Sequence, residues 1–127
     1  MNALRRFWEY CARLLAALVS RYFDTAYGIE VVEELPSRLN HRTLYIVAER
    51  GLQMQASMIC PEGCGTVINL NLLPDDHPVW RLGVDPAGRP TLHPSIWRRG
   101  ECGAHFFMRA GRLVWCDEGR SVLRTSA

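Results

Sequence analysis

Two short pairs of metal-binding residue types carry the clearest chemistry in this sequence. Cys60 and Cys64 form the first pair, and Cys102 and His105 form the second. Thiolate sulfur and imidazole nitrogen are ligands that Zn²⁺ prefers, and four of them suit its tetrahedral geometry. Glycines flank both pairs, so each can lie in a turn. The pattern predicts a zinc site, against the alternative of reduced, buried cysteines and a core histidine.

The number of ligands that bind decides what such a site can do. If Cys60, Cys64, Cys102 and His105 all coordinate the ion, its shell is full and the site is structural. If only three coordinate it, water can take the fourth position, and zinc lowers the pKa of that water towards ~7. The sequence leaves both possibilities open.

A catalytic zinc site also needs a carboxylate for proton transfer and a donor for the oxyanion. Glu49 ends a predicted strand just before a glycine turn, where a catalytic carboxylate can lie, although an exposed loop glutamate fits equally. Ser95 directly follows Pro94 and could stabilise an oxyanion, orient water or be an ordinary turn serine. A nucleophilic pair of Ser95 with His93 is conceivable, because residues two apart on a strand share a face.

The elements that must position these residues change character along the chain. Residues 3–23 show apolar side chains at three- and four-residue steps, which predicts an amphipathic helix. After it, short β-branched or aromatic runs alternate with turn residues, as in antiparallel strands. The predicted strands are Leu44–Ala48, Ser57–Ile59, Thr66–Leu72, Trp80–Val84, Phe106–Arg109 and Leu113–Trp115. No βαβ repeat is present, so a parallel sheet is not expected.

We therefore predict an α+β fold with three parts. Residues 1–28 form the N-terminal amphipathic helix, residues 29–120 a small antiparallel β-rich domain organised around the zinc site, and residues 121–127 a flexible tail. The apolar face of the helix could pack on its own domain, dock to a partner protein or lie on a membrane surface.

Size and composition limit the classes of function. With 127 residues, 48% hydrophobic and 22% charged, the chain is one ordinary globular domain. A net charge of +2 without a basic tract gives no reason to expect a nucleic-acid partner. Charged residues interrupt the helix, so no membrane span is expected. Five cysteines without an export signal indicate reduced thiols in the cytoplasm.

Six stretches of the chain together resemble a small bacterial zinc-binding domain family, formerly of unknown function, over roughly residues 30–117. Its members occur beside ubiquitin-like proteins and enzymes that resemble ubiquitin-activating and ubiquitin-conjugating enzymes. The matching stretches are Val32–Pro36, Leu44–Glu49, Cys60–Gly65, Thr91–Trp97, Cys102–Phe107 and Arg112–Cys116. The chain departs from the family's pattern at Glu62, where members usually carry a third cysteine.

The resemblance implies a zinc-dependent peptidase that trims the C-terminus of a ubiquitin-like precursor or removes the modifier from its targets. Glu49 would be general base and then acid, Ser95 would stabilise the oxyanion, and Zn²⁺ would be held by Cys64, Cys102 and His105, with Cys60 the least certain ligand. Partners would be the ubiquitin-like protein and, through the helix, an activating or conjugating enzyme. The alternatives are a non-catalytic zinc-ribbon-like interaction module, and a serine-type hydrolase in which Ser95 is the nucleophile and zinc is structural.

Overall fold

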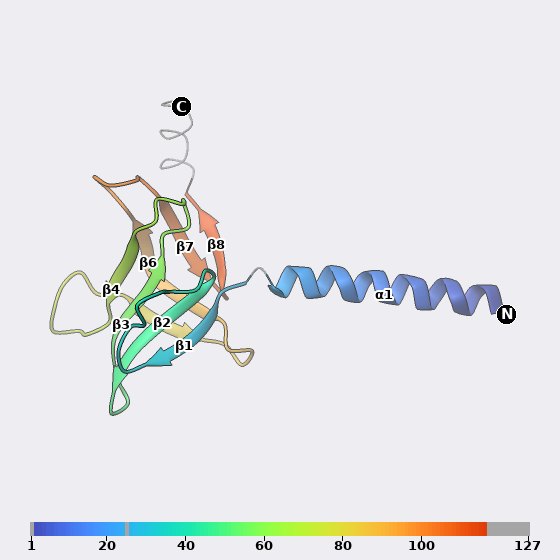
Figure 1. Ribbon diagram of the computed structural model, residues 1–127, viewed down its shortest axis with the longest axis horizontal. Coiled ribbons are helices and arrows are strands. Elements are labelled where there is room, and N and C mark those ends of the chain that lie inside the picture. The colour runs from blue at the N-terminus through green and yellow to red at the C-terminus, as the bar shows by residue number, and fades with distance from the viewer. Residues whose placement is uncertain (1, 25, 117–127) are drawn as a thin grey trace.

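The computed structural model describes residues 2–24 and 26–116, which form one N-terminal helix and two four-stranded sheets (Figure 1). The helix α1 spans Asn2–Asp24. The first sheet has the order β1-β2-β3-β4, and its strands are Gly28–Val32, Thr43–Glu49, Leu52–Ile59 and Val67–Asn71. The second sheet has the order β5-β6-β7-β8, and its strands are Arg81–Val84, Pro90–Trp97, His105–Arg109 and Arg112–Trp115.

The two sheets share one hydrophobic core because each strand turns alternate side chains inward. Leu44 and Ile46 of β2 are fully buried, as are Phe106 and Met108 of β7. Buried residues of β3, β4 and β6 complete the same cluster, and they are Ala56, Met58, Ile68, Leu70, Leu92 and Ile96. Side chains on the other face of each strand therefore point away from this core.

Helix α1 extends away from both sheets (Figure 1). Among residues 2–18, the part of the helix whose side chains the structure describes, the large apolar side chains are exposed, from 48% for Leu14 to 75% for Trp8. This part of the helix therefore does not complete the core of the β domain. Within the described residues no helix is both long and apolar enough to cross a membrane.

Removing residues 1–25 should leave the β domain folded, because the core cluster contains none of the α1 side chains that the structure describes, those of residues 2–18. We expect the truncated protein to unfold cooperatively with a Tm close to that of the full chain, measured by circular dichroism at matched concentration. A truncated protein that is insoluble, or that unfolds without a transition, would show that α1 is structural.

The predicted strand runs are confirmed, but two features of the sheets differ from expectation. β1 pairs with β2 in parallel, with Ile29 opposite Leu44, so the first sheet is mixed, although its other pairs are antiparallel as expected. The connection over residues 33–42 makes this possible, and its Asn40 N–H donates to the Tyr45 hydroxyl. The second difference is β6, which was not predicted as a strand because Pro94 interrupts its alternating pattern.

The β2–β3 hairpin sets where the ends of two strands lie. Arg50 and Gly51 form its turn with φ angles of 51° and 80°, as a tight two-residue turn with both φ values positive requires. Glu49 and Leu52 are paired beside this turn. Since β3 then runs 8 residues to Ile59, its far end lies about 25 Å from the turn.

Candidate active site and metal centre

Three cysteine thiols meet at the end of the sandwich opposite the β2–β3 turn. Cys60 directly follows β3, Cys64 lies in the next turn, and Cys102 lies in the loop before β7. All three sulfurs lie within 4.8 Å of one another, and the sulfurs of Cys60 and Cys102 are 3.5 Å apart. Zinc bonds to sulfur at about 2.3 Å, so tetrahedral ligands have sulfurs about 3.8 Å apart. The three thiols therefore fit a zinc ion.

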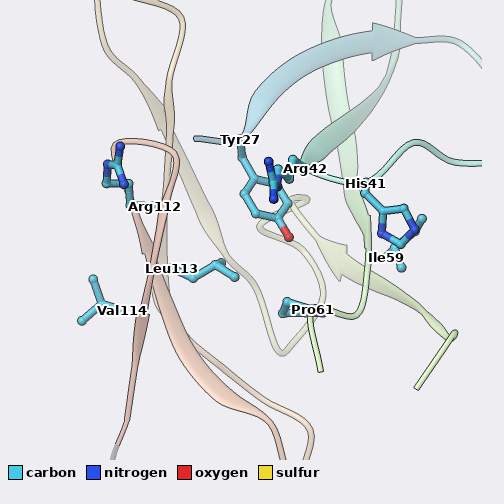
Figure 2. Close-up of a pocket in the computed structure, with 8 residues that line it drawn as sticks. All are labelled: Tyr27, His41, Arg42, Ile59, Pro61, Arg112, Leu113 and Val114. Atoms are coloured by element: carbon cyan, nitrogen blue, oxygen red, sulfur yellow. The ribbon is translucent and has the colours of Figure 1, made fainter. Parts of the chain in front are cut away.

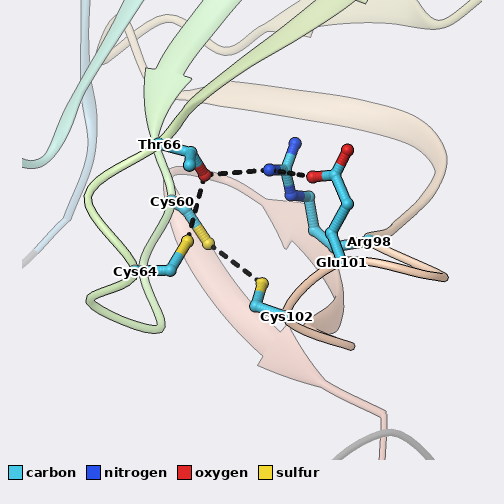
Figure 3. A network of polar contacts seen from close by, with 6 residues as sticks. All are labelled: Cys60, Cys64, Thr66, Arg98, Glu101 and Cys102. Atoms are coloured by element: carbon cyan, nitrogen blue, oxygen red, sulfur yellow. Dashed lines mark hydrogen bonds and ion pairs between the residues drawn. The ribbon is translucent and has the colours of Figure 1, made fainter.

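A chain of polar contacts reaches Cys64 from Arg98, the residue after β6 (Figure 3). The Arg98 guanidinium donates to the Thr66 hydroxyl oxygen at 2.8 Å, and that hydroxyl lies 3.0 Å from the Cys64 sulfur. Arg98 also pairs with Glu101. The hydrogen bond from Thr66 is the main cause that lowers the pKa of Cys64 to about 7. Burial, in contrast, raises the pKa of Cys60 to about 12.

These unequal pKa values predict which thiol reacts first in metal-free protein. Because the thiolate is the nucleophile, iodoacetamide should alkylate Cys64 before Cys60, at a rate that rises as the pH passes through about 7. Peptide mapping by mass spectrometry at several pH values measures this order. Thr66→Val should move the rise to higher pH, whereas Thr66→Ser, which keeps the hydroxyl, should not. Alkylation of Cys60 first would contradict the prediction.

A serine and a histidine are in hydrogen-bond contact on the neighbouring sheet. The Ser95 Oγ atom lies 3.0 Å from the His105 Nε2 atom, and both residues are half-buried. Ser95 belongs to β6 and His105 is the first residue of β7. This contact is the arrangement of a nucleophile beside its general base.

A bulge in β6 explains how these two side chains meet. Leu92 pairs with Met108 and Ile96 pairs with Phe106, so residues 93–95 of β6 face one residue of β7. Pro94 lies inside this bulge, and its nitrogen has no hydrogen to donate to a neighbouring strand. Bulges re-aim side chains, and here the Ser95 hydroxyl is turned towards a histidine that it does not face directly in the ladder.

The His105 ring is held by stacking. It lies 4.6 Å from the Trp97 ring, centroid to centroid, with 9° between the planes. The Arg99 guanidinium carbon lies 4.7 Å from the centroid of the Trp97 ring. His105 Nδ1 is buried and has no hydrogen-bond partner in the described part of the chain. In a catalytic triad a carboxylate orients the histidine ring. Here the stacking on Trp97 orients it.

The structure therefore places His105 in contact with Ser95, and the close group of cysteine sulfurs does not include it. Among residues 2–24 and 26–116, the group of close metal-binding side chains contains Cys60, Cys64 and Cys102 alone. His105, the expected fourth ligand, is not in this group. It pairs with Trp97 on the outer face of its sheet, whereas the next residue, Phe106, points into the core.

Glu49 is also not found beside the cysteines. It is exposed at the β2–β3 turn, about 25 Å along the hairpin from the end of β3 that precedes Cys60. A carboxylate at that distance cannot exchange a proton with a group bound at the cysteine cluster. The sequence correctly placed Glu49 at the end of a strand. The β2–β3 hairpin, however, puts Glu49 at the end of the domain opposite Cys60.

A cavity of about 580 Å³ opens beside Pro61, the residue after Cys60 (Figure 2). Arg42, Arg112 and the hydroxyl-bearing ring of Tyr27 contribute to its wall. Burial raises the pKa of the Tyr27 hydroxyl, and nearby Arg42 opposes that rise. Neither Ser95 nor His105 lines this cavity, so it is separate from the serine–histidine contact.

Comparison with known families identifies a protease family. The family model BubE, described as the serine protease of a bacterial ubiquitination-like system, matches residues 31–116. The chain belongs to this family. No curated protein and no solved structure matches the chain.

The BubE match covers Ser95, His105 and the three clustered cysteines, and it leaves α1 outside. It supports the expected pathway and the expectation of a protease, whereas the expected metallopeptidase class is not confirmed. The family description says serine protease, so it gives no support to the zinc-dependent chemistry that the sequence suggested. From the sequence, His93 was the candidate partner of Ser95, and His105 was assigned to the metal because its spacing after Cys102 suits a ligand. The alternation along residues 104–108 puts Ala104, Phe106 and Met108 in the core and His105 on the opposite face of the strand.

Proposed function

We propose that this chain is a serine hydrolase that cleaves the bond at the C-terminus of a ubiquitin-like protein, with Ser95 as nucleophile and His105 as general base. The 3.0 Å contact between Ser95 Oγ and His105 Nε2 carries the proposal. The family description supports both the serine class and the pathway. The bond would join the modifier to the rest of its precursor or to a target.

The chemistry of this pair would follow nucleophilic catalysis. His105 Nε2 accepts the Ser95 hydroxyl proton as Oγ bonds to the scissile carbonyl carbon. The carbonyl reforms as the leaving amine or alcohol departs with the proton from His105, and the modifier tail remains as an ester on Ser95. Water then attacks the ester carbonyl carbon while Nε2 takes a proton from that water. The bond between this carbon and Oγ breaks, and Nε2 returns the proton to Oγ. The products are the free modifier carboxylate and the restored serine.

The cysteine cluster would hold Zn²⁺ through Cys60, Cys64 and Cys102. The bound ion would supply a cross-link between the end of β3 and the loop that leads into β7. Because β7 begins at His105, that cross-link would keep the general base in register with β6. Three protein ligands would leave one position of the ion open to water. In this proposal the metal acts as a cross-link, and His105 carries the proton transfer.

Labelling with a serine-directed fluorophosphonate tests the nucleophile. We expect one adduct per chain, mapped to Ser95 by mass spectrometry, and no adduct after His105→Ala. Glu49→Gln should label and cleave at the wild-type rate, because Glu49 lies at the far end of the hairpin. An unlabelled Ser95, together with cleavage that stops on metal chelation in a still-folded protein, would instead make hydrolysis metal-dependent.

The exposed apolar face of α1 supports a docking role within the same pathway. Leu4, Phe7 and Trp8 at its start are 67–75% exposed, and buried aromatic side chains dominate binding energies at protein interfaces. We place the activity in the cytoplasm with an activating or conjugating enzyme as the partner of α1. Removing residues 1–25 should weaken co-purification with that enzyme and leave cleavage of a short tail peptide unchanged. Equal co-purification of both forms would rule out this docking role.

A further inference from the structure

One edge of β6 is open directly beside the serine. β5 pairs with residues 90–93 of β6, and in the part of the chain that the structure describes no strand pairs with residues 94–97 on that side. On the other side, Ile96 and Trp97 pair with β7. The final stretch of β6 therefore has one bonded edge and one open edge.

The ladder shows which backbone groups face the open edge. Arg98 N–H donates to the Ala104 carbonyl at 2.7 Å, so residue 98 faces β7. Successive residues of a strand direct their backbone groups to opposite sides, so residues 95 and 97 face away from β7. The Trp80 indole N–H confirms this at Ser95, because it donates to the Ser95 carbonyl at 3.3 Å. The Ser95 N–H and both backbone polar groups of Trp97 are thus directed to the open edge.

A narrow cleft lies along this edge. It has a volume of about 160 Å³, and Trp97, Trp80 and Asn69 are among the residues that line it. The opposite wall is β4, which is itself an edge strand of the other sheet. At one end, Trp80 N–H donates to the Asn71 carbonyl, and at the other Arg98 donates to Thr66, so both strands are held in place.

We propose that the open edge of β6 at residues 95–97 is the substrate-binding edge, where an extended tail with small side chains adds as a strand beside Ser95. This inference rests on the proposed function and names its substrate class. Strand addition satisfies the backbone groups of both partners and is a recurrent mode of peptide recognition. It also brings a tail carbonyl next to the Ser95 hydroxyl, which lies on the same short stretch. The cleft is lined by Ile96 and Trp97 and not by Ser95, so its small volume limits the tail side chains that lie beside residues 96–97.

Amide hydrogen exchange tests the edge without requiring turnover. The probe is a synthetic peptide of the C-terminal tail of the pathway's ubiquitin-like protein, added to the full-length Ser95→Ala variant. At about ten times its Kd, exchange of the amides at positions 95 and 97 should slow about tenfold. The Leu82 amide on the open edge of β5 and the Leu113 amide on that of β8 should be unchanged.

Peptides methylated at single backbone nitrogens give a second measurement. A strand alternates its backbone groups, so methylation should weaken binding about tenfold at every second position and much less at the positions between. Protection at Leu82 or Leu113, no protection at positions 95 and 97, or equal effects of methylation at all positions would overturn the inference. The proposed function fails separately, if Ser95→Ala still cleaves the precursor.

Discussion

Ser95→Ala is expected to reduce kcat/KM for cleavage of a ubiquitin-like precursor by about 10³-fold or more, without changing Tm or metal content. The reason is that Ser95 Oγ, 3.0 Å from His105 Nε2, would form the covalent bond to the substrate. His105→Ala should cost a similar factor, and the double variant little more, because the two residues act as one unit. Intact mass spectrometry of the precursor over time measures the rates.

Matched controls are available within the same chain. His93 is exposed and lies two residues from Ser95, and Ser37 is an exposed serine. His93→Ala should cleave within about twofold of wild type because the histidine in contact with Ser95 is His105. Ser37→Ala should do the same, as is usual for surface substitutions away from a site. Wild-type cleavage by Ser95→Ala would refute the nucleophile assignment, and wild-type cleavage by His105→Ala would refute the general base.

Loss of one clustered cysteine should have the largest effect on stability. In Cys102→Ser we expect loss of bound zinc and a fall in the free energy of unfolding of about 3–5 kcal/mol, or about 15 °C or more in Tm. The cause is that the metal would join the end of β3 to the loop before β7, two segments that meet through Cys60 and Cys102. Elemental analysis and calorimetry measure the two quantities.

Cys11→Ser is the matched control, since Cys11 is exposed on α1 and takes no part in the cluster. It should keep full metal content and the wild-type Tm. Chelation should lower the Tm of wild type to that of Cys102→Ser and leave Cys102→Ser itself unmoved. The stabilising metal site would be contradicted if the wild-type protein contained no zinc and its Tm did not change on addition of the chelator.

Local pattern was enough to predict most of the elements. The three- and four-residue apolar steps of α1 and the alternating runs of β2, β4, β5, β7 and β8 depend on side chains near in sequence. The turn at Ala110 and Gly111 was also predictable, because both residues adopt positive φ in a two-residue hairpin. Likewise, the short spacing between Cys60 and Cys64 was sufficient to indicate a metal site.

Strand pairing was not predictable in the same way. β1 is short and mostly exposed, so its own residues do not predict that it pairs with β2 or that the pairing is parallel. β6 carries Pro94 in a bulge, and its identity as a strand depends on β5 and β7 on its two sides. These are contacts between residues distant in sequence, and they follow from how the two sheets cover each other's apolar faces.

The sequence by itself determined the residue types of the site, namely a serine, a histidine and three clustered cysteines within the stretch that identifies the family. Only the tertiary structure decided which of these side chains meet. The bulge in β6 and the register with β7 turn His105 towards Ser95, while its neighbour Phe106 enters the core. The direction of the β2–β3 hairpin removes Glu49 from the cysteines. Side-chain direction in a sheet depends on register, and register is set by long-range packing.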